Sequence, residues 1–374
     1  MKKQPDRDHF TVTATEACDR IGISRETLYA YVSRGLVRTI AHPGDGRRSL
    51  YDRRDIQALL ERKRRGRSRR AAAESTINWG EPVLKSKITR ISDGQFYYRG
   101  RNAIEWSRDQ TLEDTLALLA AVRTRSSLQT MSSVATPDHA RPFDRIVAMM
   151  AAQAVGNPCG DGRPRAAELL RLTAMSAAGA PVHPQLPVHE ILARAWSDRS
   201  DVADMLRRAL VLCADHELNA SAYAARVAAS AGASLPACLL AGLATLSGTR
   251  HGGMTARCRR WMEAVDRDGL SKLSPSKAPP GFGHPLYPDG DPRTVELLNQ
   301  CALTPKWNSV VRRVYDATGS HPSLDFALVH IKRRYRLPVG AALGLFAVGR
   351  TVGWLAHIFE QRQSGRLIRP RASS

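Results

Sequence analysis

The sequence predicts a mainly α-helical protein, in which a short N-terminal unit with a β-hairpin precedes a much longer helical body. Alanine is abundant and aromatic residues make up only 6% of the 374 residues, and alanine is the strongest helix former. Residues 11–62 change from helical to alternating patterning around a Gly-Asp-Gly turn. Most of the chain beyond residue 110 divides into helix-length segments bounded by glycine, proline or aspartate, which are helix start and stop signals.

The N-terminal unit, residues 1–62, contains two short helices separated by a glycine. After a polar stretch at 1–10, a first helix ends at Gly22, and Ser24 is a good N-cap for a second helix over 25–32. Residues 37–51 alternate in polarity around the Gly-Asp-Gly turn, which indicates a β-hairpin, and a third helix is expected at 53–60. Two helices at this spacing are typical of a helix-turn-helix.

The residue order in this unit resembles the winged DNA-binding domains of the MerR and excisionase type. The matching stretches are Thr-x-x-Glu-Ala, Gly-Ile-Ser-Arg-Glu-Thr-Leu-Tyr and Gly-Leu-Val. The resemblance implies that Arg25, Thr27 and Tyr29 of the second helix face base edges in the major groove of DNA. Arg47 and Arg48 on the hairpin wing are placed to pair with phosphates. The alternative is a helix-turn-helix that contacts another protein.

Residues 63–77 are interpreted as a linker, because seven of the nine residues at 62–70 are basic and like charges at this density resist packing. The segment is either a solvated tether or an arm that lies along DNA phosphates. Over the whole chain, 56 Lys and Arg against 35 Asp and Glu leave a net charge of +21. This balance suits an anionic partner such as nucleic acid, CoA or a dicarboxylate.

The longer body is expected to begin with short strands or loops at 78–110 and to hold a loop at 124–141. The stretch from Ala214 to Met254 predicts two closely packed helices, with Pro236 in the first turn of the second helix and a His at each end, His216 and His251. The Gly-Gly after His251 lets the backbone lie close to a ligand. Other helices are expected at 112–122, 142–155, 165–178, 199–214, 255–266, 293–301, 306–317, 323–334 and 339–363.

Several motifs of this body, in one order, resemble those of citrate synthases. They are Gly-Gln-Phe-Tyr-Tyr-Arg-Gly at 94–100, Asp-His-Glu…Asn-Ala-Ser at 215–221, Gly-x-x-His-Gly-Gly at 248–253, Gly-Phe-Gly-His at 281–284, Asp-Pro-Arg at 291–293, Leu-Asp-Phe at 324–326, Gly-Arg-Thr-Val-Gly-Trp at 349–354 and Arg-Pro-Arg at 369–371. An ordered set is far more specific than any single motif. The resemblance spans about 78–371 and implies an all-α large domain, 78–251 and 340–374, and an all-α small domain, 252–339.

The resemblance also implies a reaction in which acetyl-CoA condenses with oxaloacetate to give citrate and CoA. The methyl group of acetyl-CoA is a very weak acid, so the reaction needs a positioned base and hydrogen-bond donors for the enolate. By resemblance Asp325 is the base, neutral His251 donates to the thioester oxygen, and His284 polarises the oxaloacetate carbonyl. His216 helps to bind oxaloacetate. No metal or cofactor beyond the acyl-CoA co-substrate is expected.

Three arginines match the family positions that hold the dicarboxylate, since guanidinium groups grip carboxylates in a bidentate manner. Arg293 and Arg350 would serve their own subunit, whereas Arg369 matches the arginine that a partner subunit donates. The resemblance therefore implies a homodimer with shared active sites. Two departures stand out. Pro288 occupies a place where many members have a basic residue for the CoA phosphates, and Lys277 or Lys306 would have to replace that residue. Arg250 precedes His251 where an apolar residue is usual.

Composition argues for a cytoplasmic protein without a membrane segment. No uninterrupted apolar run is long enough to span a bilayer, and the charged N-terminus lacks the apolar core of a signal peptide. The six cysteines are scattered without a C-x-x-C pair, which is typical of reduced, buried thiols.

Two alternatives to a citrate synthase with an added DNA-binding domain stay open: a transcriptional regulator whose body senses metabolites, and a 2-methylcitrate synthase that uses propionyl-CoA.

Overall fold

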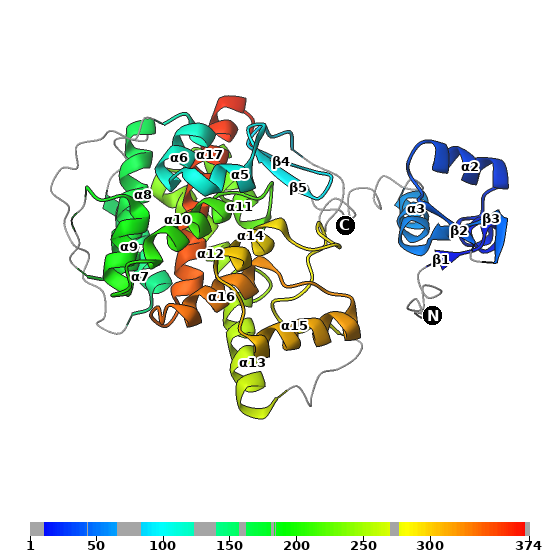
Figure 1. Cartoon of the computed structure of the whole chain (residues 1–374). Helices are drawn as coiled ribbons and strands as arrows, with labels where there is room; N and C mark the ends of the chain where they lie inside the picture. The colour runs from blue at the N-terminus through cyan, green and yellow to red at the C-terminus, as the bar shows by residue number, and fades with distance from the viewer. Residues whose placement is uncertain are drawn as a thin grey trace. The chain divides into compact units, whose positions relative to one another are not determined.

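A computed structural model describes residues 11–42, 44–65, 84–122, 140–156, 162–180, 183, 185–269 and 277–370. The chain divides into two compact units, residues 1–85 and 86–374. In the part that the structure describes, the first unit contains a small sheet and three helices, and the second is mainly α-helical (Figure 1). The mainly α fold predicted from the sequence is confirmed.

The first unit is a helix-turn-helix followed by a β-hairpin. Helices α1 (Ala14–Ile21) and α2 (Arg25–Ser33) are joined through Gly22, which adopts φ +65° and therefore a conformation that favours glycine. Strands β1 (Thr11–Val12), β2 (Thr39–His42) and β3 (Asp45–Asp52) form an antiparallel sheet in the order β1-β3-β2, and α3 (Arg53–Arg65) follows.

Local signals explain why these helices begin where they do. Thr13 and Glu16 form a reciprocal capping box at the start of α1, and the Ser24 hydroxyl accepts from the Thr27 N–H at the start of α2, as such caps do. Asp52 accepts from the Arg54 N–H, 2.8 Å away, at the start of α3. A core of its own, built around the fully buried Leu28 with Ala17 and Ile56, holds the unit together.

The second unit starts with a three-stranded antiparallel sheet, β4 (Thr89–Ser92), β5 (Gln95–Tyr98) and β6 (Arg101–Asn102), in that order. Helices make up most of the rest. They are α5 (Ala103–Asp109), α6 (Leu112–Ala120), α7 (Pro142–Gly156), α8 (Arg163–Ala178), α9 (Val188–Trp196), α10 (Val202–Cys213), α11 (Ala220–Ser230), α12 (Leu235–Leu246), α13 (Met254–Asp268), α14 (Pro292–Gln300), α15 (Pro305–Thr318), α16 (Leu324–Arg334) and α17 (Ala341–Ser364).

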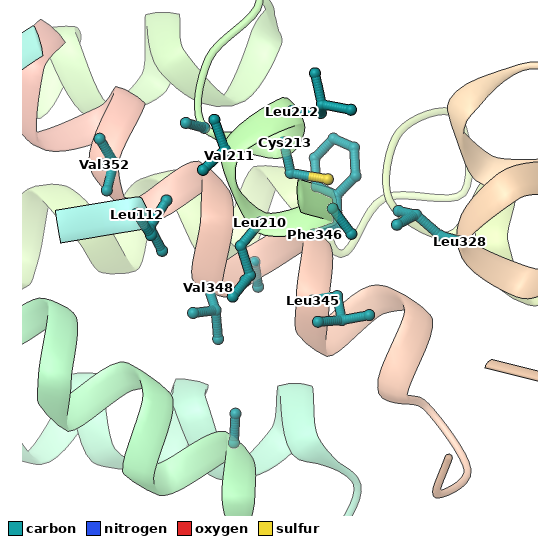
Figure 2. Close-up of a cluster of buried hydrophobic side chains, with 14 of the residues drawn as sticks. Leu112, Leu210, Val211, Leu212, Cys213, Leu328, Leu345, Phe346, Val348 and Val352 are labelled. Atoms are coloured by element: carbon teal, nitrogen blue, oxygen red, sulfur yellow. The ribbon is translucent and has the colours of Figure 1, made fainter. Parts of the chain in front are cut away.

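The 24-residue helix α17, drawn in orange to red in Figure 1, runs through the core of the second unit. It is long and apolar enough to cross a membrane, but nearly all of it is buried inside the protein. Its apolar side chains, among them Leu345, Val348 and Val352, belong to one cluster with Leu210 and Val211 of α10 (Figure 2). Burial of this apolar surface is the main stabilising contribution to the unit.

Two glycines let the end of α10 approach α17 closely. A Cβ atom at Gly349 would lie 2.7 Å from the Leu210 carbonyl oxygen, and one at Gly353 would lie 2.3 Å from the Ala214 carbonyl oxygen. The Gly353 N–H instead donates to that Ala214 oxygen at 3.0 Å. The glycines of the Gly-Arg-Thr-Val-Gly-Trp motif thus fix Arg350 against the turn that carries His216.

The structure refines several sequence-based expectations. The expected helices are present within a few residues of their predicted ends, and Pro236 lies in the first turn of α12 as predicted. Helix α5 replaces part of the strand or loop expected at 78–110, and α9 was not predicted; both are short, so periodicity identifies them poorly. Residues 63–65 of the predicted linker belong to α3, whereas residues 66–77 of the linker and 124–139 of the predicted loop lie outside the described residues.

Candidate active site and nucleic-acid interface

His216 lies in the turn between α10 and α11, and its ring contacts two side chains of the segment 284–287. Its Nε2 is 2.8 Å from the hydroxyl oxygen of Tyr287, and its ring centroid is 5.3 Å from that of His284 in a perpendicular arrangement. Burial lowers the pKa of His216 well below its usual value, and the nearby charge of Arg293 lowers it further. The ring is therefore neutral at physiological pH.

His284 is also neutral, and its tautomer follows from a backbone contact. Burial, together with the Arg293 charge, lowers the pKa of His284 to about 4. The Leu286 N–H donates to Nδ1 of His284 at 3.2 Å, so the single proton of the neutral ring lies on Nε2. A neutral imidazole that donates its N–H can polarise a carbonyl group.

A short antiparallel bridge brings the segment of His284 together with the start of α16, where Asp325 lies. The bridge joins Phe282 to Pro322, with the Gly283 N–H donating to the His321 carbonyl and the Ser323 N–H donating to the Gly281 carbonyl, both at 2.8 Å. The bridge thereby holds the segment of His284 beside the first turn of α16, which carries Asp325.

Asp325 has the properties of a carboxyl group suited to take up a proton. It lies in the first turn of α16, where the helix dipole favours the charged form. Burial nevertheless raises the pKa of Asp325 to about 7, with Arg293 opposing and Asp291 reinforcing the shift. A base is most effective when its pKa lies near the working pH.

His251 lies in the turn between α12 and α13 and contacts α11. Its Nε2 is 2.8 Å from the Oγ of Ser221. Burial and the Arg350 charge lower the pKa of His251 to about 4, so this ring is neutral as well. The following glycines, Gly252 and Gly253, lie against Leu246 and Gly248 of their own chain. The two glycines thus allow close packing within this turn, and the predicted approach to a ligand stays a prediction.

Arg293 and Arg350 are both buried, but they are held differently. The Nε and NH2 atoms of Arg293 donate to the two Asp291 carboxylate oxygens at 2.9 and 2.7 Å, a bidentate pair. The Nε of Arg350 donates to the Cys213 carbonyl at 2.9 Å, and its guanidinium lies over the Phe346 ring. Asp291 thus orients Arg293, and the backbone of α10 orients Arg350.

The two arginines connect the histidines and the aspartate into one cluster. The Arg293 charge acts on His216, His284 and Asp325, and the Arg350 charge acts on His216 and His251. The structure therefore gathers six of the seven catalytic and binding residues predicted for this body. Arg369, the seventh, is exposed in the segment after α17.

A second row of buried polar residues supports the turn at His216. The carboxylate of Asp215 accepts from the Thr89 hydroxyl at 2.6 Å and lies 3.3 Å from His357 Nε2. Arg226 donates to His357 Nδ1 at 3.1 Å and to Glu360 at 2.7 Å. Burial raises the pKa of Asp215, but His357, Arg350 and the Thr89 bond outweigh it, so the net pKa is lowered.

Sequence reasoning did not assign roles to Ser221, Tyr287 or Asp291, although each lies within or next to a quoted motif. Ser221 ends Asn-Ala-Ser, Asp291 opens Asp-Pro-Arg, and Tyr287 follows Gly-Phe-Gly-His by three residues. Residue type alone does not separate such partners from structural residues. Their contacts with His251, His216 and Arg293 are what identify them.

The residues at the two departures from the family pattern, and the two lysines predicted as substitutes, can also be placed. Lys277 and Lys306 are both exposed, and Lys306 forms an ion pair with Asp266 at 2.9 Å. Pro288 and Arg250 are exposed as well.

In the first unit, the predicted DNA-contacting residues lie on α2 and on the wing. The Arg25 guanidinium donates to the Thr15 hydroxyl at 3.0 Å, Thr27 takes part in the Ser24 cap, and Tyr29 is 54% exposed. Arg48 is exposed and lies 3.3 Å from an Asp45 carboxylate oxygen. Arg47 belongs to β3, and its side chain lies outside the described part of the chain.

Comparisons with known proteins agree with this architecture. A helix-turn-helix domain model matches residues 11–64. Relatives include the citrate synthase of Haloferax volcanii, 34% identical over 188 residues that cover 46% of this chain and 50% of the relative. Citrate synthase 2 of Bacillus subtilis is 33% identical over 185 residues, covering 45% and 50%. The chain thus spans about half the length of the curated relatives it matches.

Solved structures show the same fold. The citrate synthase of Thermotoga maritima superposes with a TM-score of 0.60 at 21% identity, covering 79% of this chain and 94% of that one. The citrate synthase of Thermoplasma acidophilum, solved in a ternary complex with carboxymethyl coenzyme A and oxaloacetate, gives 0.59 at 21% identity, covering 78% and 93%. The model of the citrate synthase C-terminal domain matches residues 77–371, and the chain therefore belongs to the citrate synthase family.

Proposed function

We propose that this protein condenses acetyl-CoA with oxaloacetate to give citrate and CoA. The observation that carries the proposal is Asp325, a partly buried carboxyl group whose pKa is raised to about 7 beside two buried arginines and neutral histidines. A protein that only binds a dicarboxylate needs cations, whereas a base for a carbon acid needs a carboxyl group of this kind.

The reaction begins at the acetyl group. Asp325 takes a proton from the methyl carbon, and the N–H of neutral His251 donates to the thioester oxygen on which negative charge develops. The enolate carbon then attacks the oxaloacetate carbonyl carbon, whose oxygen accepts a hydrogen bond from Nε2 of His284. Water hydrolyses the resulting citryl thioester, which releases CoA as the free thiol.

Binding of oxaloacetate rests on Arg293, Arg350 and His216. Arg293 uses its Nε and NH2 atoms for Asp291, and its remaining donors are proposed to reach a substrate carboxylate. Arg350 makes one backbone bond through Nε and is proposed to grip the other carboxylate with its terminal nitrogens. Arg369 of a partner subunit would complete the pocket, which requires a homodimer with shared sites.

The proposal also covers DNA binding, the cellular location and a second acyl substrate. The N-terminal unit would bind DNA, and the protein would act in the cytoplasm. A relative named 2-methylcitrate synthase 2, from Corynebacterium glutamicum, is 31% identical over 190 residues, so propionyl-CoA is the second acyl substrate to be compared.

A metabolite-sensing regulator is the second candidate function, and the helix-turn-helix domain is the observation that favours it. In that case the second unit would bind oxaloacetate or an acyl-CoA and change DNA binding without chemistry. Measuring the release of free CoA distinguishes the two functions, since only the enzyme releases it.

A thiol assay with oxaloacetate and either acetyl-CoA or propionyl-CoA tests the proposal. We expect CoA release by the wild-type protein and a loss of at least about a hundredfold in kcat for Asp325→Ala, as for loss of a positioned base. Asp316→Ala, at an exposed position of α15, is the matched control. Wild-type protein that binds oxaloacetate but releases no CoA with either substrate would favour the sensor.

A further inference from the structure

Tyr287 contacts three of the side chains proposed to hold the oxo acid. Its hydroxyl lies 2.8 Å from His216 Nε2. Its ring centroid is 5.1 Å from that of His284, and the Arg293 guanidinium carbon lies 5.7 Å from the same centroid. The side chain is 3% exposed, so these contacts are made in a largely dry environment where hydrogen bonds are strong.

The direction of the hydrogen bond between Tyr287 and His216 follows from their protonation. Burial raises the pKa of Tyr287 and lowers the pKa of His216, so each group is neutral and has one polar hydrogen. A phenol is the better donor and an imidazole nitrogen the better acceptor. The Tyr287 O–H therefore donates to Nε2, and the proton of His216 lies on Nδ1.

We propose that Tyr287 is a positioning residue for the oxo acid, which holds the His216 ring in one orientation and one tautomer. This inference rests on the proposed function, because it assigns His216 to the binding of oxaloacetate. A ring free to rotate or to exchange tautomers would present an N–H to the substrate only part of the time, and binding would weaken by that fraction.

The backbone of this segment does not depend on the hydroxyl group. The Tyr287 N–H donates to the His284 carbonyl at 2.9 Å, and the Gly290 N–H donates to the Tyr287 carbonyl at 3.2 Å. Tyr287→Phe keeps these bonds and the ring contacts with His284 and Arg293. It removes only the bond to His216, and it is therefore a clean variant for the test.

We expect Tyr287→Phe to raise the KM for oxaloacetate and its Kd, measured by calorimetry, about five- to tenfold, in line with loss of one buried hydrogen bond. The KM for acetyl-CoA should stay within about twofold, because Tyr287 acts only on the oxo acid. Tyr335→Phe is the matched control, since Tyr335 is buried outside the site and packs against Arg199.

A double-mutant cycle separates positioning from general damage to the fold. If Tyr287 acts through His216, Tyr287→Phe should weaken oxaloacetate binding in the wild-type background and should have no effect in the His216→Ala background. Equal weakening in both backgrounds, or an unchanged Kd in Tyr287→Phe, would overturn the inference.

Calorimetry also tests this inference separately from the proposed reaction, because it measures oxaloacetate binding without catalysis. Wild-type protein that binds oxaloacetate but releases no CoA would refute the enzyme and leave the Tyr287 test valid. Normal catalysis with an unchanged Kd in Tyr287→Phe would refute the role of Tyr287 alone. Wild-type protein that binds no oxaloacetate would refute both.

Discussion

The Nε2 atom of His251 lies 2.8 Å from the Oγ of Ser221, and the indole N–H of Trp354 donates to the same oxygen at 3.2 Å. The Ser221 hydroxyl donates its one hydrogen to the Asn219 side-chain oxygen, 2.7 Å away. A turn of the hydroxyl that gives this hydrogen to Nε2 of His251 instead would place the imidazole proton on Nδ1, where His251 can offer it to a thioester oxygen.

This contact predicts that Ser221→Ala lowers catalysis by freeing the His251 ring. We expect kcat for citrate formation to fall about ten- to a hundredfold, since a misplaced donor stabilises the enolate poorly. Ser247→Ala, at the exposed end of α12, should leave kcat unchanged. A Ser221→Ala enzyme with wild-type kcat would show that the His251 ring is oriented by other contacts.

The raised pKa of Asp325 predicts the pH dependence of activity. Only the ionised carboxylate can accept the methyl proton, so kcat/KM should fall as the pH is lowered through about 7 and should level off above it. The profile of kcat/KM for acetyl-CoA between pH 5 and 9 provides the measurement. A profile that is flat down to about pH 5, close to the usual range of a carboxyl group, would contradict the assignment.

The same raised pKa predicts that the free energy of unfolding decreases as the pH rises, whereas activity increases. The folded-state pKa of Asp325 lies above its unfolded value, so the folded protein keeps this proton where the unfolded chain has lost it. Its contribution is present below about pH 4 and is lost as the pH rises through about 7. Asp325→Asn should therefore raise the free energy of unfolding at pH 8, by up to about 4 kcal/mol, while abolishing activity. If denaturant titrations at pH 8 show no higher free energy of unfolding for Asp325→Asn than for the wild-type protein, burial is not the cause of the raised pKa.

Gly353 is predicted to be intolerant of a side chain. An added Cβ would meet the Ala214 carbonyl oxygen at 2.3 Å and an Asp215 carboxylate oxygen at 2.5 Å, and backbone cannot move aside as a flexible side chain can. Gly353→Ala should lower the free energy of unfolding by about 2 kcal/mol or more. Gly162→Ala, where the nearest atom would be 3.5 Å away, is the control in thermal unfolding.

The predicted shared site can be tested by mixing inactive subunits. Arg369→Ala and Asp325→Ala proteins should each be poorly active, and after subunit exchange one pocket of the heterodimer would contain both wild-type residues. In an equal mixture that exchanges at random, about half of the dimers are heterodimers with one intact pocket of two, so we expect up to about a quarter of the wild-type activity per site. Arg366→Ala, at a neighbouring exposed position, should be fully active. Verified exchange without regained activity would argue for pockets built from one chain.

The helix-turn-helix unit predicts salt-dependent DNA binding. Arg25→Ala should relax sequence preference, whereas Arg47→Ala and Arg48→Ala should weaken binding to all DNA and reduce the salt slope by about one each. Because a dimeric body would carry two such units on tethers, varied half-site spacing should be tolerated. Deletion of residues 1–75 should leave acyl transfer largely intact. Gel-shift titrations at several salt concentrations test this, and absence of binding at low salt would indicate a protein-contact domain.

The sequence by itself determined the helices and most of the motif residues. Ser24, Gly22 and Pro236 mark helix ends through local bonds and dihedral preferences, and the structure has those ends. Helices α5 and α9, 7 and 9 residues long, were missed, because helices this short are recognised by their end signals rather than by periodicity.

Only the tertiary structure decided the state and the partners of the site residues. Tyr287 and His216 are 71 positions apart, and Arg226 and His357 are 131 apart, so no local pattern relates them. The pKa values of Asp325, His251 and His284 depend on burial and on charges from other segments. Burial is a property of the packed core, because desolvation arises only when distant segments exclude water together.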